Sequence, residues 1–301
     1  LKKATEIFNH LEFKSLIPRL PQPNHANLQP QTPTKSNPKP NQSSILFENL
    51  VKNKKYVTIN TIPELKKLLS QLAQGFTFDT ETSSLDLFDS QTKLVGISLA
   101  VKPHEAYYLP LNHQSIQSSN HSSNNFPSPK LKIENCQQQF DPVGGKLEIK
   151  NLPLPETIKL LKPIFQNPQI PKTAHNLKFD LKALQLVGIQ TTGPFFDTMI
   201  ASYLLNPNHP TAHKLDHLSL TYLDHRMIPI TDLIGTGSKQ ISFDQVSIED
   251  ATIYSAEDAD VTNLIQEKLK TQLAAQNLTE IYEKIELPLV NVLADIEQNG
   301  F

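Results

Sequence analysis

The spacing of apolar residues changes several times along the chain. Residues 4–20 carry apolar side chains at helical spacing and predict a short helix that ends at proline. Residues 21–45 are mostly Pro, Asn, Gln and Ser, so they cannot bury enough apolar surface to offset the entropy lost on ordering. We therefore predict a disordered linker between this helix and the rest of the chain.

From residue 55 onward the pattern is that of a folded domain. Runs rich in β-branched and aromatic residues predict four strands, and helical spacing between the first two predicts a helix. The strands cover 55–59, 75–81, 93–101 and 105–111, and the helix covers 62–74. Because only a few turn-forming residues separate the last three strands, they favour an antiparallel three-stranded meander.

The second half of the chain is mainly helical. Apolar spacing predicts one strand over 170–175 and helices over 155–166, 176–189, 197–205, 213–223 and 247–276. Asp197 is a natural N-cap for the third helix. Residues 112–151 are rich in Ser, Asn and Gln and predict a surface insertion. The order of strands, then alternating strand and helix, then helices indicates the α/β class, with a mixed sheet flanked by helices.

The composition narrows the possible functions. The 301 residues are 38% hydrophobic, enough for a sizeable core, and the net charge of -2 gives no broad basic face for duplex nucleic acid. The single cysteine, Cys136, excludes an intramolecular disulfide and a multi-cysteine zinc site. No run is long enough to span a membrane and no signal-peptide pattern is present, so we expect a soluble intracellular protein. The chain starts at Leu1 and stops at "EQNGF", which suggests a fragment of something longer.

The run "GFTFDTE" places two acids where burial of charge is costly. In a strand alternate side chains share a face, so Asp79 and Glu81 lie together. Phe76, Phe78 and Thr80 share the other face. Like charges this close repel strongly unless a cation lies between them, and carboxylate oxygens favour Mg²⁺ or Mn²⁺. The alternative is an edge strand whose acids are simply solvated.

A third acid lies on the apolar side of a predicted helix. Three leucines form the apolar sector of the helix over 176–189, and Asp180 falls within that sector. An acid there needs a partner, and Asn176 lies on the same side four residues earlier, where it could bond a ligand. The alternative is that Asp180 sits at the margin of the stripe and reaches water.

A fourth acid interrupts the inward stripe of the longest predicted helix. Asp258 stands at the centre of that stripe, and the small residues around it leave room for an ion and a substrate. Tyr254 lies one turn earlier on the same side, where its hydroxyl could reach a metal-bound water; the alternative is a core tyrosine with its hydroxyl at the surface. Glu257 and Asp260 fall away from the stripe, so we expect them on a solvated face.

These four acids and the tyrosine together point to one chemistry. Two divalent ions roughly 3.5 to 4 Å apart, held by carboxylates, catalyse in-line attack of water on a phosphodiester. One ion activates the water and the other stabilises the leaving oxygen. The residues therefore indicate a metal-dependent phosphodiester hydrolase.

Three segments carry a resemblance to a known family. "DTETSSLD", "AHNLKFDLKAL" and "YSAEDADVT" resemble, in order, the three motifs of the DEDD exonuclease superfamily, tyrosine subtype. The resemblance is specifically to the 3′-to-5′ proofreading exonuclease domain of bacterial DNA polymerase I, and it covers most of the chain. It implies an exonuclease domain over 46–280, the tail of a 5′ nuclease domain over 1–20 and the start of a polymerase domain over 281–301.

The resemblance implies an RNase H-like fold and a two-metal site. Two divalent ions, Mg²⁺ or Mn²⁺, would be bound by Asp79, Glu81, Asp180 and Asp258. Tyr254 would orient the nucleophilic water with help from Glu81.

The resemblance also implies a set of substrate contacts. Leu85 would wedge against the terminal base of a frayed 3′ end, and Thr80, Thr82 and Asn176 would contact the last nucleotides. The chain departs from the family pattern at His175, where Gln is common, and at Phe179, where Tyr is common. The first departure puts the substrate contact at that position in doubt.

The function implied is hydrolysis of single-stranded 3′ ends of DNA by a monomer joined to a polymerase domain, in the bacterial cytoplasm at the nucleoid. Gripping only a few nucleotides by stacking and local contacts is compatible with the small net charge. Two alternatives remain: an RNA-trimming exonuclease of the RNase D type, and an inactive RNase H-like spacer within a polymerase.

Overall fold

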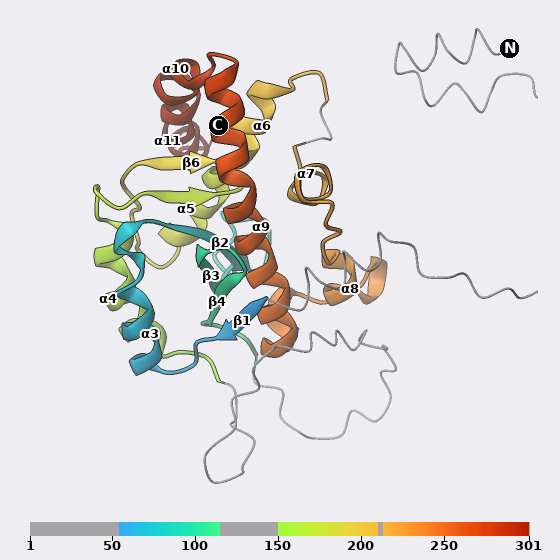
Figure 1. Cartoon of the computed structure of the whole chain (residues 1–301). Coiled ribbons are helices and arrows are strands. Elements are labelled where there is room, and N and C mark those ends of the chain that lie inside the picture. The colour runs from blue at the N-terminus through green and yellow to red at the C-terminus, as the bar shows by residue number, and fades with distance from the viewer. Residues whose placement is uncertain (1–53, 115–149, 210–212, 301) are drawn as a thin grey trace, which may run out of the picture. The chain divides into compact units, whose positions relative to one another are not determined.

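The computed structural model describes three stretches of the chain, residues 54–114, 150–209 and 213–300 (Figure 1). The helix predicted over 4–20 and the linker predicted over 21–45 lie outside these stretches. So do residues 115–149, which make up most of the predicted insertion.

A six-stranded mixed sheet is formed by the described residues. Its strands are β1 (Lys55–Thr58), β2 (Phe76–Thr82), β3 (Leu94–Lys102), β4 (Glu105–Pro110), β5 (Lys172–Ala174) and β6 (Phe195–Asp197). The order across the sheet is β1-β4-β3-β2-β5-β6. The predicted antiparallel meander β2-β3-β4 is confirmed, while β1 pairs parallel to β4 and β5 and β6 extend the other edge in parallel. The prediction of a mixed α/β fold is thus confirmed.

Helices cover both faces of this sheet. They are α3 (Ile62–Leu69), α4 (Leu154–Phe165), α5 (Leu177–Gln185), α6 (Thr198–Leu205), α7 (Leu215–Leu223), α8 (Ile230–Ile234), α9 (Ile248–Ala275), α10 (Thr279–Ile281) and α11 (Leu287–Gln298). Figure 1 shows α9 running across the strands, with α3 and α4 on the opposite side. The predicted helix over 62–74 is shorter than expected, because α3 ends at Leu69 and a separate 3₁₀ turn follows at Leu72–Gln74.

Local sequence signals explain where several helices begin. Thr61 and Glu64 form a reciprocal capping box at the start of α3. The carboxylate of Asp197 accepts from the backbone N–H groups of Met199 and Ile200, so its predicted N-cap role at α6 is confirmed. The Ser247 side chain caps α9 in the same way.

The main core lies between the sheet and helices α3, α4 and α5. Phe76 and Phe78 of β2 both point into it, and each ring meets the ring of Phe165 edge-on at a centroid distance of 5.2 Å. Because side chains alternate along β2, Asp79 and Glu81 point to the opposite face, toward α9. The strand therefore presents apolar rings to the core and acids to the helix.

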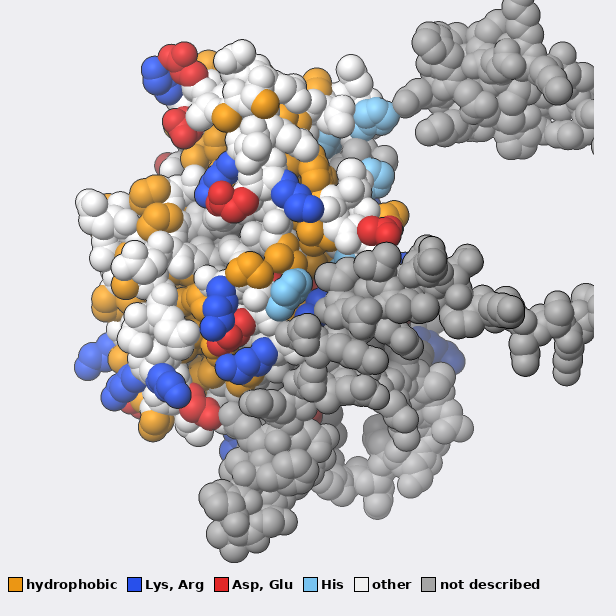
Figure 2. Space-filling model, in the orientation of Figure 1, with side chains coloured by type: hydrophobic (Ala, Val, Ile, Leu, Met, Phe, Trp, Pro, Cys, Tyr) orange, Lys and Arg blue, Asp and Glu red, His pale blue; other side chains and the backbone are white. Residues whose placement is uncertain are grey.

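Helix α9 is covered on more than one side. It packs along β1, β2, β3 and β4, and α6 and α7 also contact it. As a result almost every side chain from Ala251 to Thr262 is buried, rather than one stripe alone. No helix in the described stretches is both long and apolar enough to span a bilayer. Figure 2 shows acidic and basic side chains interspersed on the visible face, without a broad basic area.

Candidate active site

Three carboxylates meet where β2 ends against α9. Asp79 and Glu81 come from β2 and Asp258 from α9, and each offers an oxygen that lies within 4.8 Å of those of the other two. All three side chains are half-buried. We call these three residues the acid cluster. The strand period predicted that Asp79 and Glu81 share a face, and the helix stripe predicted that Asp258 points inward.

Asp180 lies beside the acid cluster but is not one of the three closest acids. It is buried on α5, and its Oδ1 accepts hydrogen bonds from the backbone N–H (3.1 Å) and the hydroxyl (2.6 Å) of Thr80. Its Oδ2 is buried and has no hydrogen-bond partner among the described residues. Burial, together with the charge of Asp79, raises the pKa of Asp180. The apolar-stripe prediction for Asp180 is therefore confirmed, and one of its oxygens is free for a ligand.

Ionising all four acids of this region at once is energetically unfavourable. Burial raises the pKa of Asp79 to about 7, and burial together with the charge of Asp79 raises that of Glu81 to about 8. Burial and the neighbouring carboxylates also raise the pKa of Asp258 and Asp180 well above their ordinary values. Among the described residues, no lysine, arginine or histidine forms an ion pair with any of these four acids.

This donor set fits divalent metal ions. Several hard carboxylate oxygens converge. Within residues 54–114, 150–209 and 213–300, no basic residue offsets their mutual repulsion and the buried Oδ2 of Asp180 has no hydrogen-bond partner. Oxygen-only donors of this kind suit Mg²⁺ or Mn²⁺. Asp79, Glu81 and Asp258 could together hold a metal ion, and Asp180 lies next to Asp79.

Two hydroxyl groups border the acid cluster. Ser255 of α9 donates a hydrogen bond of 2.7 Å to Oε1 of Glu81. Tyr254 is half-buried one turn before Asp258, and burial together with the charges of Asp258, Glu81 and Asp79 raises the pKa of its hydroxyl far above the ordinary value. Tyr254 therefore keeps its proton at neutral pH and acts there as a hydrogen-bond donor.

The residues predicted to contact the substrate differ in their exposure and in their hydrogen bonds. Leu85 is 86% exposed in the loop after β2, and Thr82 beside it donates to the carbonyl of Ser84. Asn176 is exposed and has a positive φ of 66° at the start of α5. Thr80 is buried and bonded to Asp180, on the face of β2 opposite Asp79 and Glu81. Their contacts with a substrate stay predictions.

His175, the first departure from the family pattern, contacts another residue of the protein. Nδ1 of His175 lies 2.9 Å from the hydroxyl of Thr198. Burial lowers the pKa of His175 to about 4, so the ring is neutral at physiological pH.

The prediction that Glu257 and Asp260 lie on a solvated face is wrong, because both are buried. Glu257 accepts from His225 Nε2 at 2.8 Å and lies 3.7 Å from the ammonium of Lys54. Asp260 accepts from the hydroxyl of Tyr56 at 2.9 Å. The error arose because a single inward stripe was assumed for a helix that is covered on several sides.

We call Glu257, Asp260 and their partners Lys54, Tyr56, His104 and His225 the paired network. The backbone N–H of His104 completes it with a 2.7 Å hydrogen bond to Asp260. Sequence spacing offers no signal for these contacts, since Lys54 and His225 are 171 residues apart. The small apolar residues next to these acids, Ala256 and Ala259, were the sequence signal that could have indicated that Glu257 and Asp260 are buried.

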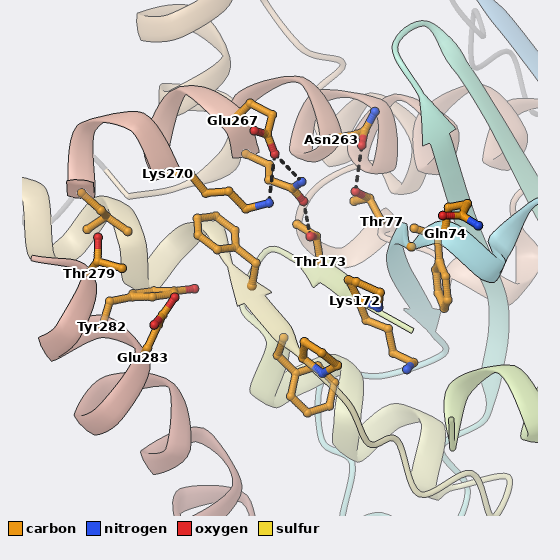
Figure 3. Close-up of a pocket in the computed structure, with 18 of the residues that line it drawn as sticks. Gln74, Thr77, Lys172, Thr173, Asn263, Glu267, Lys270, Thr279, Tyr282 and Glu283 are labelled. Carbon is orange, nitrogen blue, oxygen red and sulfur yellow. Dashed lines mark hydrogen bonds and ion pairs between the residues drawn. The ribbon is translucent and has the colours of Figure 1, made fainter. Parts of the chain in front are cut away.

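A separate pocket of about 650 Å³ lies at the other end of β2 (Figure 3). Its walls come from the start of β2, from β5 and β6 and from the second half of α9. Polar side chains there bond one another: Thr77 donates to Asn263, and Thr173 donates to Gln266. This pocket contains none of the acid cluster, so the cluster remains the candidate site.

The fold and the acid cluster define an RNase H-like nuclease, in which a mixed sheet and the helices on it bring carboxylates together. Residues 56–274 match the model of the 3′-5′ exonuclease family, and the chain belongs to this family. It is 37% identical to DNA polymerase I of Rhizobium leguminosarum and 38% identical to that of Chloroflexus aurantiacus. These matches cover 81% and 78% of the chain, but only 23% and 21% of the relatives.

Solved structures share the fold at low sequence identity. Brucella melitensis NrnC superposes with a TM-score of 0.54 at 17% identity, covering 82% of this chain and 95% of that one. The POL domain of Pol1 from M. smegmatis, in complex with DNA primer-template and dNTP, superposes with a TM-score of 0.52 at 16% identity. That match covers 80% of this chain and 31% of the other. These structures share the fold, and the family match and the polymerase relatives confirm the resemblance to the exonuclease domain of DNA polymerase I.

Proposed function

We propose that this domain removes nucleotides from single-stranded 3′ ends of DNA as the proofreading part of a DNA polymerase I. The observation that carries the proposal is the convergence of Asp79, Glu81 and Asp258, with Asp180 beside them, without any basic partner in the described stretches. An arrangement so costly for the protein alone is explained by a site for cations.

We assign the four acids to binding two divalent ions. Ions held there supply activation of a water molecule and stabilisation of the leaving oxygen of the phosphodiester. Tyr254, whose hydroxyl stays protonated, donates a hydrogen bond that orients the attacking water. Glu81 accepts a hydrogen bond from the same water and thereby fixes its direction of attack.

The exposed loop after β2 is proposed to receive the substrate. Leu85 presents an apolar side chain to solvent near the end of the strand that carries Asp79 and Glu81, where it can wedge against a terminal base. Thr82, at the end of β2, and Asn176, at the start of α5, are proposed to contact the last nucleotides. Thr80 is proposed to contact them too, and its backbone N–H and hydroxyl both donate to Asp180.

We propose a domain order along the chain. Residues 46–280 would form the exonuclease domain, residues 1–20 the tail of a 5′ nuclease domain and residues 281–301 the start of the polymerase domain. Residues 21–45 would link the first two parts, and residues 112–151 would be a surface insertion within the exonuclease domain. The complete protein would act as a monomer in the bacterial cytoplasm, at the nucleoid.

The test is digestion of a primer with a mismatched 3′ end in the presence of Mg²⁺. The wild-type protein should produce a ladder of shortened DNA, and Asp79→Ala should produce none. Glu156→Ala, which removes an exposed acid from α4, serves as the matched control and should digest like wild type. Absence of digestion by the wild type would favour the inactive spacer, and preference for an RNA oligonucleotide of the same sequence would favour the RNA-trimming alternative.

A further inference from the structure

Ser255 occupies a position from which it can control Glu81. It lies on α9 three residues before Asp258, and its side chain is fully buried. Its hydroxyl donates to Oε1 of Glu81 over 2.7 Å, which joins the helix that carries Asp258 to the strand that carries Asp79. Within the described part of the chain, Oε2 of Glu81 has no hydrogen-bond partner.

The end of β2 gives a reason why Glu81 needs such a partner. The pairing of β2 with β3 shifts between Glu81 and Thr82, so the strand is irregular at the point where this side chain leaves it. A glutamate also has more rotatable bonds than an aspartate, and holding it in one conformation costs side-chain entropy. A buried hydrogen bond to a helix fixes both the direction of the side chain and which oxygen faces the cluster.

We infer that Ser255 is a positioning residue, which holds one oxygen of the Glu81 carboxylate and leaves the other facing the metal ions and the attacking water. The inference rests on the proposed exonuclease function. Alanine has nearly the same size as serine but no donor, so only the hydroxyl distinguishes them at this position.

Asp180 shows the same arrangement at a neighbouring acid. Its Oδ1 accepts from the hydroxyl of Thr80, and its buried Oδ2 has no partner. In both cases a hydroxyl from another element of the fold holds one carboxylate oxygen, and the second oxygen has no hydrogen-bond partner. Hydrogen bonds of this kind orient metal-binding side chains and typically affect metal affinity or activity by about 10-fold or more.

The experiment compares two buried helical serines. Ser255→Ala removes the bond to Glu81. Ser202 lies on α6, outside the acid cluster, and Ser202→Ala removes a bond of 2.9 Å to Nδ1 of His213. For each variant, Mn²⁺ binding is measured by calorimetry, and kcat and KM are measured on a DNA with a single-stranded 3′ end. Ser255→Ala should weaken Mn²⁺ binding and lower kcat, each by about 10-fold, with KM within about twofold of wild type.

Ser202→Ala should bind Mn²⁺ and turn over like wild type. Ser255→Thr, which keeps the hydroxyl, should restore most of both properties. Equal Mn²⁺ binding and kcat for Ser255→Ala and Ser202→Ala would overturn the inference. So would a well-folded Ser255→Thr that is as impaired as Ser255→Ala, because packing and not the hydroxyl would then be responsible. If Ser255→Thr melts early, the comparison of the two alanine variants decides.

The wild-type protein separates this inference from the proposed function. If wild type neither binds Mn²⁺ nor digests DNA, the proposed function itself fails. If wild type does both and Ser255→Ala is unaffected, only the role of Ser255 is lost.

Discussion

Helix α9 carries two buried acidic regions of opposite character within one turn. Asp258 belongs to the acid cluster, where its neighbours are Asp79 and Glu81. Glu257 and Asp260, one and two positions away, belong to the paired network. Both regions consist of carboxylates on the same helix, packed against the same sheet. They differ in the groups that surround the carboxylates, so the comparison shows what those groups do.

In the paired network, the described partners satisfy the buried carboxylates. Glu257 has Lys54 and His225 beside one oxygen, and the backbone N–H of Ile228 donates to the other over 2.8 Å. Asp260 accepts from a tyrosine hydroxyl and a backbone N–H. In the acid cluster, by contrast, the nearest charged groups are other acids.

This difference in partners indicates a different role for each region. Burying a charge is costly unless it is paired and hydrogen-bonded, and the paired network meets that condition within the protein. The acid cluster does not meet it with any residue of the described stretches, which is the reason for proposing a partner from outside the protein. The proposed pair of divalent cations would supply the missing charge.

The strongest way to break this comparison is Asp258→Asn. It removes a charge that we assign to metal binding and should lower kcat by about 1,000-fold, since divalent ions in such sites supply several kcal/mol of charge stabilisation. In EDTA the variant should melt at the same temperature as wild type or higher, because one repelling acid is gone. A large drop in melting temperature in EDTA would instead show that Asp258 has a structural role like that of its neighbours.

The neighbouring change, Glu257→Gln, should act on stability. It leaves the buried ammonium of Lys54 without its counter-charge, and breaking a buried pair in this way costs about 3 kcal/mol. Urea unfolding would measure the loss. Glu267→Gln on the same helix is the control, because its exposed bridge to Lys270 contributes less than about 1 kcal/mol. Equal losses for the two variants would contradict the assigned role of the paired network.

The acid cluster could be predicted from the sequence because the periodicity of a single strand or helix determines which way each acid points. Alternation along β2 separates Phe76 and Phe78 from Asp79 and Glu81, whatever the strand packs against. The helical period in the same way places Asp180 among leucines. Each of these predictions needed only the residues of one element.

The paired network was beyond such reasoning because its partners come from distant elements. Whether Glu257 is solvated depends on Lys54 and His225, which no spacing within α9 encodes. The strand β6 was missed for a related reason: three residues, Phe195–Asp197, are too few to show a period, and they run directly into the N-cap of α6. Tertiary contacts decide such segments.

The pH dependence of metal binding would sharpen the comparison. Each acid must lose a proton before it binds an ion, and the raised pKa values, about 7 for Asp79 and about 8 for Glu81, place this competition near neutrality. Lowering the pH should therefore raise the half-saturating Mg²⁺ concentration by roughly 10-fold between pH 8 and 7, and more steeply between pH 7 and 6, where both acids take up protons. A half-saturating concentration that does not change over this range would rule out the competition.

Asp79 and Glu81 also make the stability of the metal-free protein depend on pH. Their pKa values in the folded state lie above the ordinary values of 3.8 and 4.5, so the folded protein binds more protons than the unfolded chain between about pH 4 and pH 8. Their contribution to stability in EDTA is therefore present at low pH and is lost as the pH rises through this window. Urea unfolding at several pH values, with and without Mg²⁺, would show whether the ion removes the loss.

The smallest predicted effect concerns Tyr254, at the border of the acid cluster. Tyr254→Phe removes the hydroxyl proposed to orient the attacking water and should lower kcat by about 10-fold or less. Mn²⁺ binding by calorimetry should be retained, because the hydroxyl is not assigned to the metal. Since burial and the nearby acids keep this hydroxyl protonated, the shape of the kcat profile between pH 6 and 9 should also match wild type. Unchanged turnover would remove Tyr254 from the mechanism, and loss of a rise in kcat with pH would show that it acts as a base.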